Sequence, residues 1–286
     1  MPGLLDYVLA YRLFRHSFFL SLYKRFSTSR GFLKTAVNLS EGFNSVKRRL
    51  GLTARDPITP YFNIRIAEGC AFKCSYCSIK FATGRIRSKP VDRIMAEFRA
   101  GLAAGHRLIQ LVCEDTGCYG IDIGSSMPAL LREMLAVDGD YQLILIDFGG
   151  YWLVKYVDEL TPLFAANPDR IRELYVSLQS GSDRVLKAMR RPEKAADVRA
   201  ALLDVKRLVP HLKLRTTVIV GFPGETEEEF ELTIGLLREI GFDAVEINRY
   251  EDRPGAYATT LPDKIPPATI ERRVERLMRT IPGARS

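Results

Sequence analysis

Three cysteines in one short segment carry the strongest chemical signal in the sequence. Cys70, Cys74 and Cys77 have the spacing C-x-x-x-C-x-x-C. Three thiolates this close together on one loop can ligate three irons of a 4Fe–4S cluster. The fourth iron then lacks a protein ligand, and such an open iron can bind and reduce a small molecule. The spacing therefore predicts redox chemistry at an open iron site.

A structural zinc site is the alternative interpretation of the same cysteines. Zinc in such sites has four nitrogen or sulfur ligands in a closed tetrahedron. The three histidines of the chain, His16, His106 and His211, all lie away from the motif. The fourth zinc ligand would therefore have to be Cys113 or Cys118.

Cysteine usage and hydropathy together indicate a reducing compartment. The chain of 286 residues has five cysteines, an odd number gathered in one short region, which does not resemble a secreted disulfide framework. No early apolar run is long enough to span a membrane. Residues 4–26 contain internal arginines and no cleavage site of the kind that ends a signal peptide. We therefore expect a cytoplasmic protein without a transmembrane span.

The elements that must position the cysteines follow a repeating pattern from residue 61 onward. Strand-like apolar runs cover residues 62–66, 108–113, 142–147, 173–178, 213–220 and 243–248. Helical patterns lie between them at residues 90–104, 127–136, 151–166, 182–190, 194–208 and 227–240. Alternating elements of this kind predict an α/β fold, a partial (β/α)6 barrel of parallel strands with right-handed connections. In such folds the reactive groups lie at the carboxyl ends of the strands.

Local signals mark several helix boundaries. Thr226 followed by Glu229 has the pattern of a capping box at a helix start. Gly241 can adopt the left-handed conformation that ends a helix. Ser126 precedes a helix whose first turn contains Pro128.

The positive charge is concentrated at the N-terminus. The chain has a net charge of +8, and residues 1–60 hold ten basic and three acidic residues. Apolar and aromatic residues recur at helical spacing in 3–27, which predicts an amphipathic helix. This helix could pack on the body, lie on a membrane surface, form an oligomer contact or clamp an anionic substrate. We expect a basic, aromatic-rich helical extension over 1–60 and a nearly neutral barrel over 61–286, which does not predict nucleic-acid binding.

Further motifs occur in a fixed order around the cysteines. They are Ser88-Lys89-Pro90, Glu114-Asp115-Thr116-Gly117-Cys118-Tyr119-Gly120, Leu178-Gln179-Ser180-Gly181-Ser182-Asp183, Met189-Arg190-Arg191, Val220-Gly221-Phe222-Pro223-Gly224-Glu225-Thr226 and Arg253-Pro254-Gly255. With the three cysteines, this series resembles the radical S-adenosylmethionine (SAM) superfamily. Within it, residues 62–280 are similar to the catalytic core of the methylthiotransferases, above all the branch that modifies an aspartate of a ribosomal protein.

The resemblance implies a 4Fe–4S cluster and SAM as cofactors. Cys70, Cys74 and Cys77 would be the cluster ligands, and the amino and carboxylate groups of SAM would chelate the open iron. An electron from a flavodoxin- or ferredoxin-type donor would cleave the sulfonium and release a 5′-deoxyadenosyl radical, which takes hydrogen from a C–H bond. The cofactors supply this chemistry, and the barrel orients them and excludes water.

The resemblance also assigns residues to SAM binding. Tyr76 would lie against the adenine, while Ser177 and Gln179 would face the ribose or the carboxylate. Arg190 or Arg191 would hold the SAM carboxylate, because a guanidinium fork suits that group. The alternatives are a solvated helix face for the two arginines and a helix cap for Gln179.

The segment after the strand at 213–220 would pass the adenine with exposed backbone. It contains Gly221, Pro223 and Glu225. The alternative for this segment is an ordinary turn at Pro223-Gly224.

The chain departs from full-length methylthiotransferases at both ends. That family carries an N-terminal domain with three further cysteines that hold a second cluster, and a C-terminal β-barrel that recognises the substrate. Here residues 1–69 contain no cysteine, and the sequence stops soon after Arg279. We therefore expect both parts to be missing, which leaves the source of the sulfur open.

Cys113, Glu114, Asp115 and Cys118 are the candidate catalytic residues, because they follow the second predicted strand at the mouth of the barrel. The two thiols could share a second iron–sulfur cluster, hold a persulfide, or return a hydrogen atom to a substrate radical. Cys118, in a glycine-containing loop, is the stronger candidate. Cys113 on a strand is expected to be a buried packing residue.

Three functions follow from these patterns. The favoured one is a radical SAM enzyme that forms a carbon–sulfur bond on a small-molecule or peptide substrate. The second is a radical SAM epimerase or oxidative tailoring enzyme in which Cys118 donates a hydrogen atom. The third is a non-catalytic metal-binding interaction module, against which the complete set of SAM motifs argues.

Overall fold

The computed structural model describes residues 61–286. The extension predicted over 1–60, including its helix at 3–27, lies outside the described residues. In the described part, a seven-stranded parallel sheet has the order β1-β4-β5-β6-β7-β8-β9, and a separate antiparallel ribbon consists of β2 and β3. The predicted α/β class with parallel strands is confirmed.

The first six strands of the sheet correspond to the six predicted ones. The strands are β1 (Phe62–Arg65), β4 (Leu108–Val112), β5 (Gln142–Gly149), β6 (Ile171–Gln179), β7 (Lys213–Val220), β8 (Ala244–Arg249) and the short β9 (Ala284–Arg285). The ribbon strands are β2 (Ala67–Glu68) and β3 (Arg87–Ser88). Within the seven-stranded sheet, each strand pairs in parallel with the next strand of the same sheet. All the carboxyl ends therefore lie at one edge.

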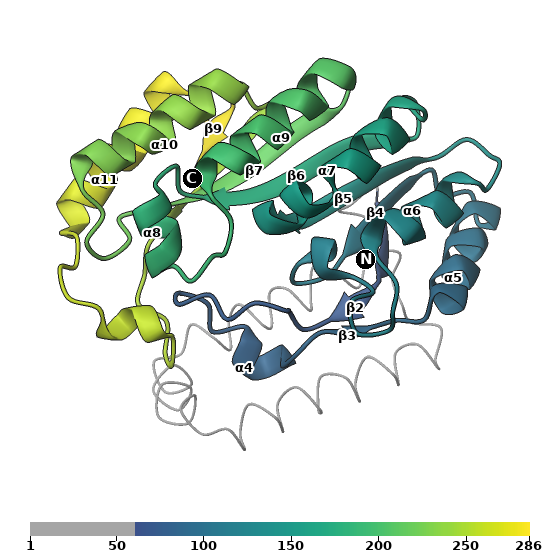
Figure 1. Cartoon of the computed structure of the whole chain (residues 1–286), viewed down its shortest axis with the longest axis horizontal. Helices are drawn as coiled ribbons and strands as arrows, with labels where there is room; N and C mark the ends of the chain where they lie inside the picture. Colours follow the sequence, from purple (N-terminus) through teal and green to yellow (C-terminus); the bar gives the residue numbers. More distant parts are fainter. Residues whose placement is uncertain (1–60) are drawn as a thin grey trace, which may run out of the picture. The chain divides into compact units, whose positions relative to one another are not determined.

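Helices follow the strands and cover the sheet. They are α4 (Lys80–Thr83), α5 (Val91–Ala103), α6 (Met127–Leu135), α7 (Gly150–Ala165), α8 (Asp183–Ala188), α9 (Ala195–Leu208), α10 (Glu227–Ile240) and α11 (Pro267–Thr280). Figure 1 shows α5, α6, α7, α9, α10 and α11 following one another in an arc along the sheet, which is the arrangement of a partial barrel. Among the described helices, none combines the length and the apolar character needed to cross a membrane.

Apolar side chains between the sheet and the helices form the core. Leu111, Leu145 and Leu174 project from three neighbouring strands and are fully buried. Leu153 of α7 and Leu202 of α9 are buried in the same cluster. Removing each such side chain from water contributes about 1.5–3 kcal/mol to the stability of the folded state. The core therefore holds in place the strand ends that form the site.

The predicted helix boundaries are present. Thr226 and Glu229 form a complete capping box at the start of α10, and Gly241 ends this helix with φ 64°. Ser126 caps α6, because its side chain accepts a hydrogen bond from the amide of Ala129.

Glu229 of the capping box also links α10 to α8. Its carboxylate accepts hydrogen bonds from Ser182 Oγ at 2.8 Å and from the Thr226 amide at 2.9 Å, and it pairs with Arg184. The hydrogen bond from Arg184 is the main reason why the pKa of Glu229 is lowered to about 2. A lowered carboxyl pKa stabilises the folded state above the unfolded-state pKa, and this stabilisation is lost as the pH falls through the folded pKa.

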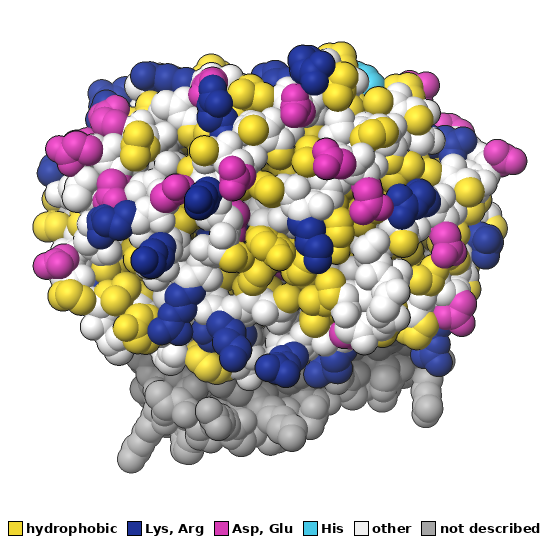
Figure 2. Space-filling model, in the orientation of Figure 1, with side chains coloured by type: hydrophobic (Ala, Val, Ile, Leu, Met, Phe, Trp, Pro, Cys, Tyr) yellow, Lys and Arg dark blue, Asp and Glu magenta, His cyan; other side chains and the backbone are white. Residues whose placement is uncertain are grey.

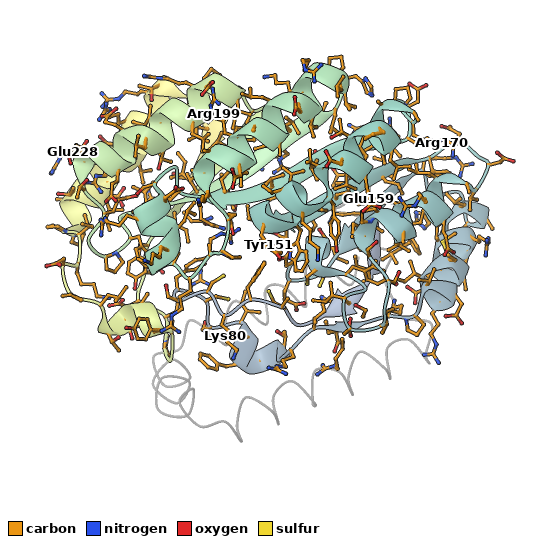
Figure 3. All side chains as sticks on the ribbon, viewed as in Figure 1. Lys80, Tyr151, Glu159, Arg170, Arg199 and Glu228 are labelled. Carbon is orange, nitrogen blue, oxygen red and sulfur yellow. The ribbon has the colours of Figure 1, made fainter. Side chains whose placement is uncertain are left out.

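Glu229→Gln is therefore expected to lower the free energy of unfolding by about 2 kcal/mol at pH 7. The difference from the natural chain should shrink below about pH 5 and vanish near the lowered pKa, as measured by urea unfolding at a series of pH values. Glu228→Gln, at an exposed position beside it on α10 (Figure 3), is the matched control. A pH-independent difference for Glu229→Gln would contradict the ion-pair explanation.

Candidate active site

An open cavity of about 270 Å³ lies where the carboxyl ends of the strands meet the cysteine segment. Cys70, Cys74 and Cys77 all line it. Burial raises the pKa of Cys70 to about 12 and also raises the pKa of Cys74. Burial thus favours the protonated thiols, and a bound metal would supply the positive charge that stabilises the thiolates.

The donor set of the cavity fits a 4Fe–4S cluster with one open iron. Among the described residues that line it, the three cysteines are joined by no fourth cysteine and no histidine. Within residues 61–286, no group of three or more His, Cys, Asp or Glu side chains is arranged to hold a single metal ion. Three sulfurs on one loop match the cluster, in which each thiolate binds a different iron.

The cysteine loop is held in place through Ser75, which is fully buried. Its hydroxyl donates to the carbonyl of Ala188 at 2.8 Å, and its amide donates to the carbonyl of Met189 at 2.9 Å. The amide of Ala258 in turn donates to the Ser75 carbonyl at 2.8 Å. The motif around Met189 therefore contacts the cysteine loop directly, although more than 100 residues separate them.

Gly69, directly before the first cysteine, lies where no side chain fits. Its φ is +79°, and a Cβ atom there would be 2.3 Å from the carbonyl oxygen of Arg85. The backbones of Cys70 and Arg85 also pair in an isolated β-bridge. The backbone of the loop therefore packs tightly against the segment before β3.

Four of the residues assigned to SAM by resemblance line the same cavity as the cysteines. They are Tyr76, Ser177, Gln179 and Arg191. Arg190 is instead exposed, and its guanidinium lies 3.9 Å from the ring centre of Tyr257. The structure therefore places Arg191, and not Arg190, at the cavity.

The buried side chain of Arg191 donates hydrogen bonds to three parts of the chain. Its Nε donates to Glu193 Oε1 at 2.5 Å, and its Nη2 donates to the carbonyl of Ser177 at 2.8 Å. Its Nη1 donates to the hydroxyl of Tyr76 at 3.3 Å. Arg191 thus connects the cysteine loop to the end of β6. A guanidinium has five N–H groups, so further donors remain for a ligand.

Gln179 ends β6 in an unusual conformation. Its φ is 68°, and the register between β6 and β7 shifts between Ser177 and Gln179. Such a conformation costs about 1 kcal/mol or more in a residue other than glycine and often occurs at functional sites. Gln179 does not cap the following helix, because the side chain of Ser182 caps α8.

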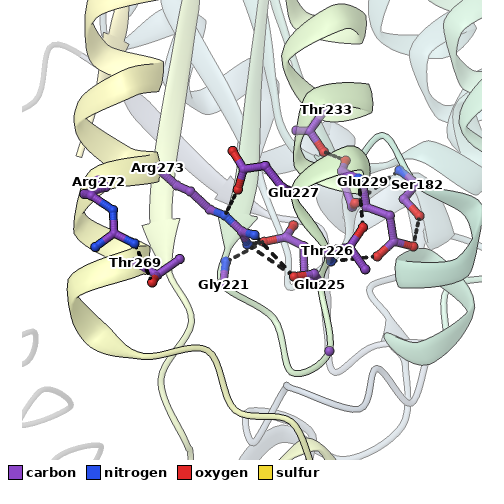
Figure 4. Close-up of polar contacts among 12 residues, drawn as sticks. Ser182, Gly221, Glu225, Thr226, Glu227, Glu229, Thr233, Thr269, Arg272 and Arg273 are labelled. Atoms are coloured by element: carbon purple, nitrogen blue, oxygen red, sulfur yellow. Dashed lines mark hydrogen bonds and ion pairs between the residues drawn. The ribbon is translucent and has the colours of Figure 1, made fainter.

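The segment after β7 is fixed by a buried ion pair (Figure 4). The Glu225 carboxylate accepts from the Gly221 amide at 2.8 Å and from Arg273 Nη1 at 2.9 Å. Gly221 has φ +83° and no space for a Cβ, which would be 2.4 Å from Ile270. The Glu225 amide donates to the carbonyl of Phe222, so the ordinary turn expected at Pro223-Gly224 is also present. The side chain of Glu225 thus binds α11, and Gly221, Pro223 and Glu225 are buried outside the cavity lining.

The four candidate catalytic residues separate into two pairs. Glu114 and Asp115 line the cavity, whereas Cys113 and Cys118 do not. Cys118 has no exposed surface, and its Sγ donates to the carbonyl of Asp115 at 3.0 Å. Hydrogen bonding with Cys113 and burial both raise the pKa of Cys118.

Asp115 is the most enclosed carboxylate of the cavity. Burial raises its pKa to about 6, although it accepts hydrogen bonds from the amides of Gly117 and Gly149 and from Trp152 Nε1 at 3.0–3.1 Å. These bonds oppose the effect of burial and fix the position of the carboxylate. Asp115 therefore connects the end of β4 to the start of α7.

Several cavity residues were not predicted from the sequence. They are Phe72, Ile79, Lys80, Asp147, Gly149, Tyr175, Thr217, Glu246 and Asn248. A signal for some of them was present, because Tyr175, Ser177 and Gln179 alternate along one strand and therefore face the same side. Lys80 lies on α4 (Figure 3), and its Nζ donates to the Cys74 carbonyl at 3.1 Å.

The fold and the site together define a partial parallel barrel with a three-cysteine loop at the carboxyl ends of its strands. The family model of the radical SAM superfamily matches residues 64–237. The chain therefore belongs to the radical SAM superfamily and is an enzyme of that class. This assignment excludes the non-catalytic module, and the family uses a 4Fe–4S cluster and SAM as its cofactors.

Curated relatives are methylthiotransferases of two kinds. The threonylcarbamoyladenosine tRNA methylthiotransferase of Thermotoga maritima is 34% identical over 85% of this chain and 55% of its own length. The ribosomal protein uS12 methylthiotransferase of Moorella thermoacetica is 33% identical over 77% of this chain and 50% of its own length. The two kinds match about equally well, and the chain spans about half the length of these relatives.

Solved structures support the fold. The radical SAM enzyme coproporphyrinogen III oxidase of Escherichia coli aligns with a TM-score of 0.56 at 17% identity, over 79% of this chain and 54% of its own. The radical SAM methyltransferase TsrM of Kitasatospora setae aligns with a TM-score of 0.55 at 17% identity, over 66% of this chain and 35% of its own. At this identity the likeness concerns the fold alone.

Proposed function

We propose that this chain cleaves SAM reductively and abstracts hydrogen from a C–H bond, in order to form a carbon–sulfur bond on a small-molecule or peptide substrate. The sulfur would come from sulfide bound to iron in a cluster, and that iron would take up the surplus electron. One observation carries the proposal. The three cysteines line a single cavity together with Tyr76, Ser177, Gln179 and Arg191, at the carboxyl ends of parallel strands.

When bound, the cluster and SAM supply the electron and the 5′-deoxyadenosyl radical for this chemistry. The protein binds and orients the reactants. Cys70, Cys74 and Cys77 would hold the cluster, and the free N–H groups of Arg191 would bind the SAM carboxylate. Ser177 and the Nε2 amide group of Gln179 would bind the ribose, and the ring of Tyr76 would contact the adenine.

The sulfur-transfer part of the proposal is supported by the curated relatives, which are named methylthiotransferases. Their names specify a tRNA or a ribosomal protein as substrate. A small molecule or peptide is proposed here because the barrel over 61–286 is almost neutral and the cavity has the size of a small ligand. None of the five cysteines forms a disulfide, which favours action in the cytoplasm.

The electron donor is proposed to be a flavodoxin or a ferredoxin that binds beside the cysteine loop. Three exposed cations lie beside this loop: Lys73 within it, Arg85 paired with Cys70 through the backbone, and Arg253, which lines a second pocket together with Cys77. Ile79 and Phe81 nearby are 46% and 58% exposed. Figure 2 shows lysine and arginine side chains along the lower edge of the displayed face. An acidic redox protein would complement such a surface.

Anaerobic reconstitution with iron and sulfide tests the proposed function. About four irons per chain are expected, together with 5′-deoxyadenosine when SAM and dithionite are added. About eight irons would show that Cys113 and Cys118 recruit a second cluster. Product mass then distinguishes sulfur insertion, which changes the composition, from epimerisation, which does not. A reconstituted chain that never yields 5′-deoxyadenosine would exclude the function.

Cys118→Ala tests the alternative in which this thiol donates a hydrogen atom. Because Cys118 is buried outside the cavity lining, we expect the variant to retain the cluster absorbance, SAM cleavage and the normal product. The free energy of unfolding should fall by about 1–2 kcal/mol, as a small buried side chain is truncated. Retained SAM cleavage with loss of the product would instead assign Cys118 to the reaction.

A further inference from the structure

Besides Asp115, three carboxylates from different strand ends line the same cavity. Glu114 follows β4, Asp147 lies near the end of β5, and Glu246 lies on β8. Strand pairing places them at the same level of the sheet, because Gly149, Ser177, Thr217 and Glu246 are successive partners across β5, β6, β7 and β8. Asp147 is two residues before Gly149, at the register shift between β5 and β6.

These three carboxylates lack a matching set of cations. Glu114 has Arg65 at 3.6 Å, but this arginine side chain is 54% exposed. Glu246 accepts a hydrogen bond from the Tyr175 hydroxyl at 2.9 Å. Asp147 forms no hydrogen bond or ion pair with any residue in the described part of the chain. Burial, with repulsion from Glu246 and Glu114, raises the pKa of Asp147 to about 6.

The cations that do line the cavity are engaged elsewhere. Lys80 Nζ donates to the carbonyl of Cys74, and Arg191 donates to Glu193, Tyr76 and Ser177. Both therefore belong to the part of the cavity formed by the cysteine loop. Arg215 of β7 does not line the cavity but acts electrostatically on Glu246, and it is already paired with Glu173 at 2.7 Å. Asp147 receives no charge compensation from any of these three cations.

An independent observation shows that the cavity also lacks a hydrogen-bond donor. Gln179 lines the cavity and is only 8% exposed, and its Oε1 has no hydrogen-bond partner among the described residues. An amide oxygen can only accept hydrogen bonds. Buried acceptors in native proteins are almost always satisfied, so a donor is expected to come from a bound molecule.

We propose that the substrate of this cavity carries a cationic nitrogen group, an ammonium or a guanidinium, that binds Asp147 and Glu246. This inference rests on the proposed function and specifies its substrate class. Such a group supplies both the positive charge and the N–H donors that the cavity lacks. A substrate with an anionic side chain would instead face three like charges.

Calorimetric titration of the reconstituted full chain, saturated with SAM and without reductant, tests the inference. The probes are the acetylated amides of arginine and lysine, compared with those of norleucine, glutamine and glutamate. We expect one cationic probe to bind about tenfold more tightly than every neutral or acidic one. Asp147→Asn or Glu246→Gln should weaken its binding by about tenfold. Asp140→Asn, an exposed carboxylate before β5, should have no effect.

Three results would overturn the inference. One is equal affinity for the neutral or acidic probes. Another is competition between the cationic probe and SAM, which would show that the carboxylates bind the ammonium group of SAM itself. The third is binding of Mg²⁺ that excludes the probe and depends on Asp147 and Glu246, which would make the carboxylates a metal site.

The same preparation separates this inference from the proposed function. If the natural chain yields 5′-deoxyadenosine with SAM and dithionite but does not prefer cationic probes, only the substrate class is wrong. If it prefers cationic probes but never cleaves SAM, the cavity binds cations and the proposed radical chemistry fails.

Discussion

Replacement of any one of Cys70, Cys74 and Cys77 by alanine is expected to abolish both the absorbance of the 4Fe–4S cluster and the cleavage of SAM. The physical reason is the number of ligands. Each thiolate binds a different iron, so two remaining sulfurs cannot hold the cube stably. The measurements are the visible absorbance after anaerobic reconstitution and the yield of 5′-deoxyadenosine under dithionite, which should fall to background.

The controls for this experiment come from the same chain. Cys113→Ala removes a thiol that does not line the cavity, so this variant should keep its cluster. The three cluster cysteines lie in a loop outside the regular strands and helices, so circular dichroism of their variants should match that of the natural chain. If the triple alanine variant still produced 5′-deoxyadenosine, the assignment of the cluster ligands would be wrong.

The sheet was predictable because its strands are continuous apolar runs with clear boundaries. Helix α11 was overlooked although its buried apolar residues, Ile270, Val274 and Leu277, have the i, i+4, i+7 spacing of an amphipathic helix. Helix α4 has only four residues, too few to show a helical period, and β9 has two. Such elements depend on tertiary contacts more than on local sequence pattern.

The candidate site was predictable only where its residues are close together in the sequence. The spacing of the cysteines is a local property, so the sequence alone indicates the cluster. The choice between Arg190 and Arg191 depends instead on a non-local fact, namely which of them reaches Tyr76 in the cysteine loop. Asp147 and Glu246 were missed because no local pattern indicates that the ends of β5 and β8 line one cavity.

Arg191 is the residue for which structural and functional roles most need to be separated. Its side chain is 6% exposed and that of its partner Glu193 is 2% exposed. Arg191→Met would leave the buried carboxylate of Glu193 without its cation. The second oxygen of this carboxylate, Oε2, already lacks a partner among the described residues. Breaking a buried pair in this way costs about 3–5 kcal/mol, whereas replacing both partners by apolar residues is often nearly neutral.

We therefore expect Arg191→Met to lower the free energy of unfolding by about 3–5 kcal/mol. The double variant Arg191→Met/Glu193→Leu should recover most of this loss, to within about 1 kcal/mol of the natural chain. Its affinity for SAM should nevertheless stay about tenfold or more below normal, because the donors for the SAM carboxylate remain absent. Urea unfolding and calorimetric titration with SAM measure the two effects separately.

Arg273→Met on α11 is the control for destabilisation as such. Arg273 is another buried arginine with a carboxylate partner, Glu225, but it does not line the cavity. Its removal should cost stability and affect SAM affinity less than the Arg191 variants do. If the stable double variant bound SAM as tightly as the natural chain, Arg191 would serve only to connect the cysteine loop to β6, and the SAM carboxylate would require another donor.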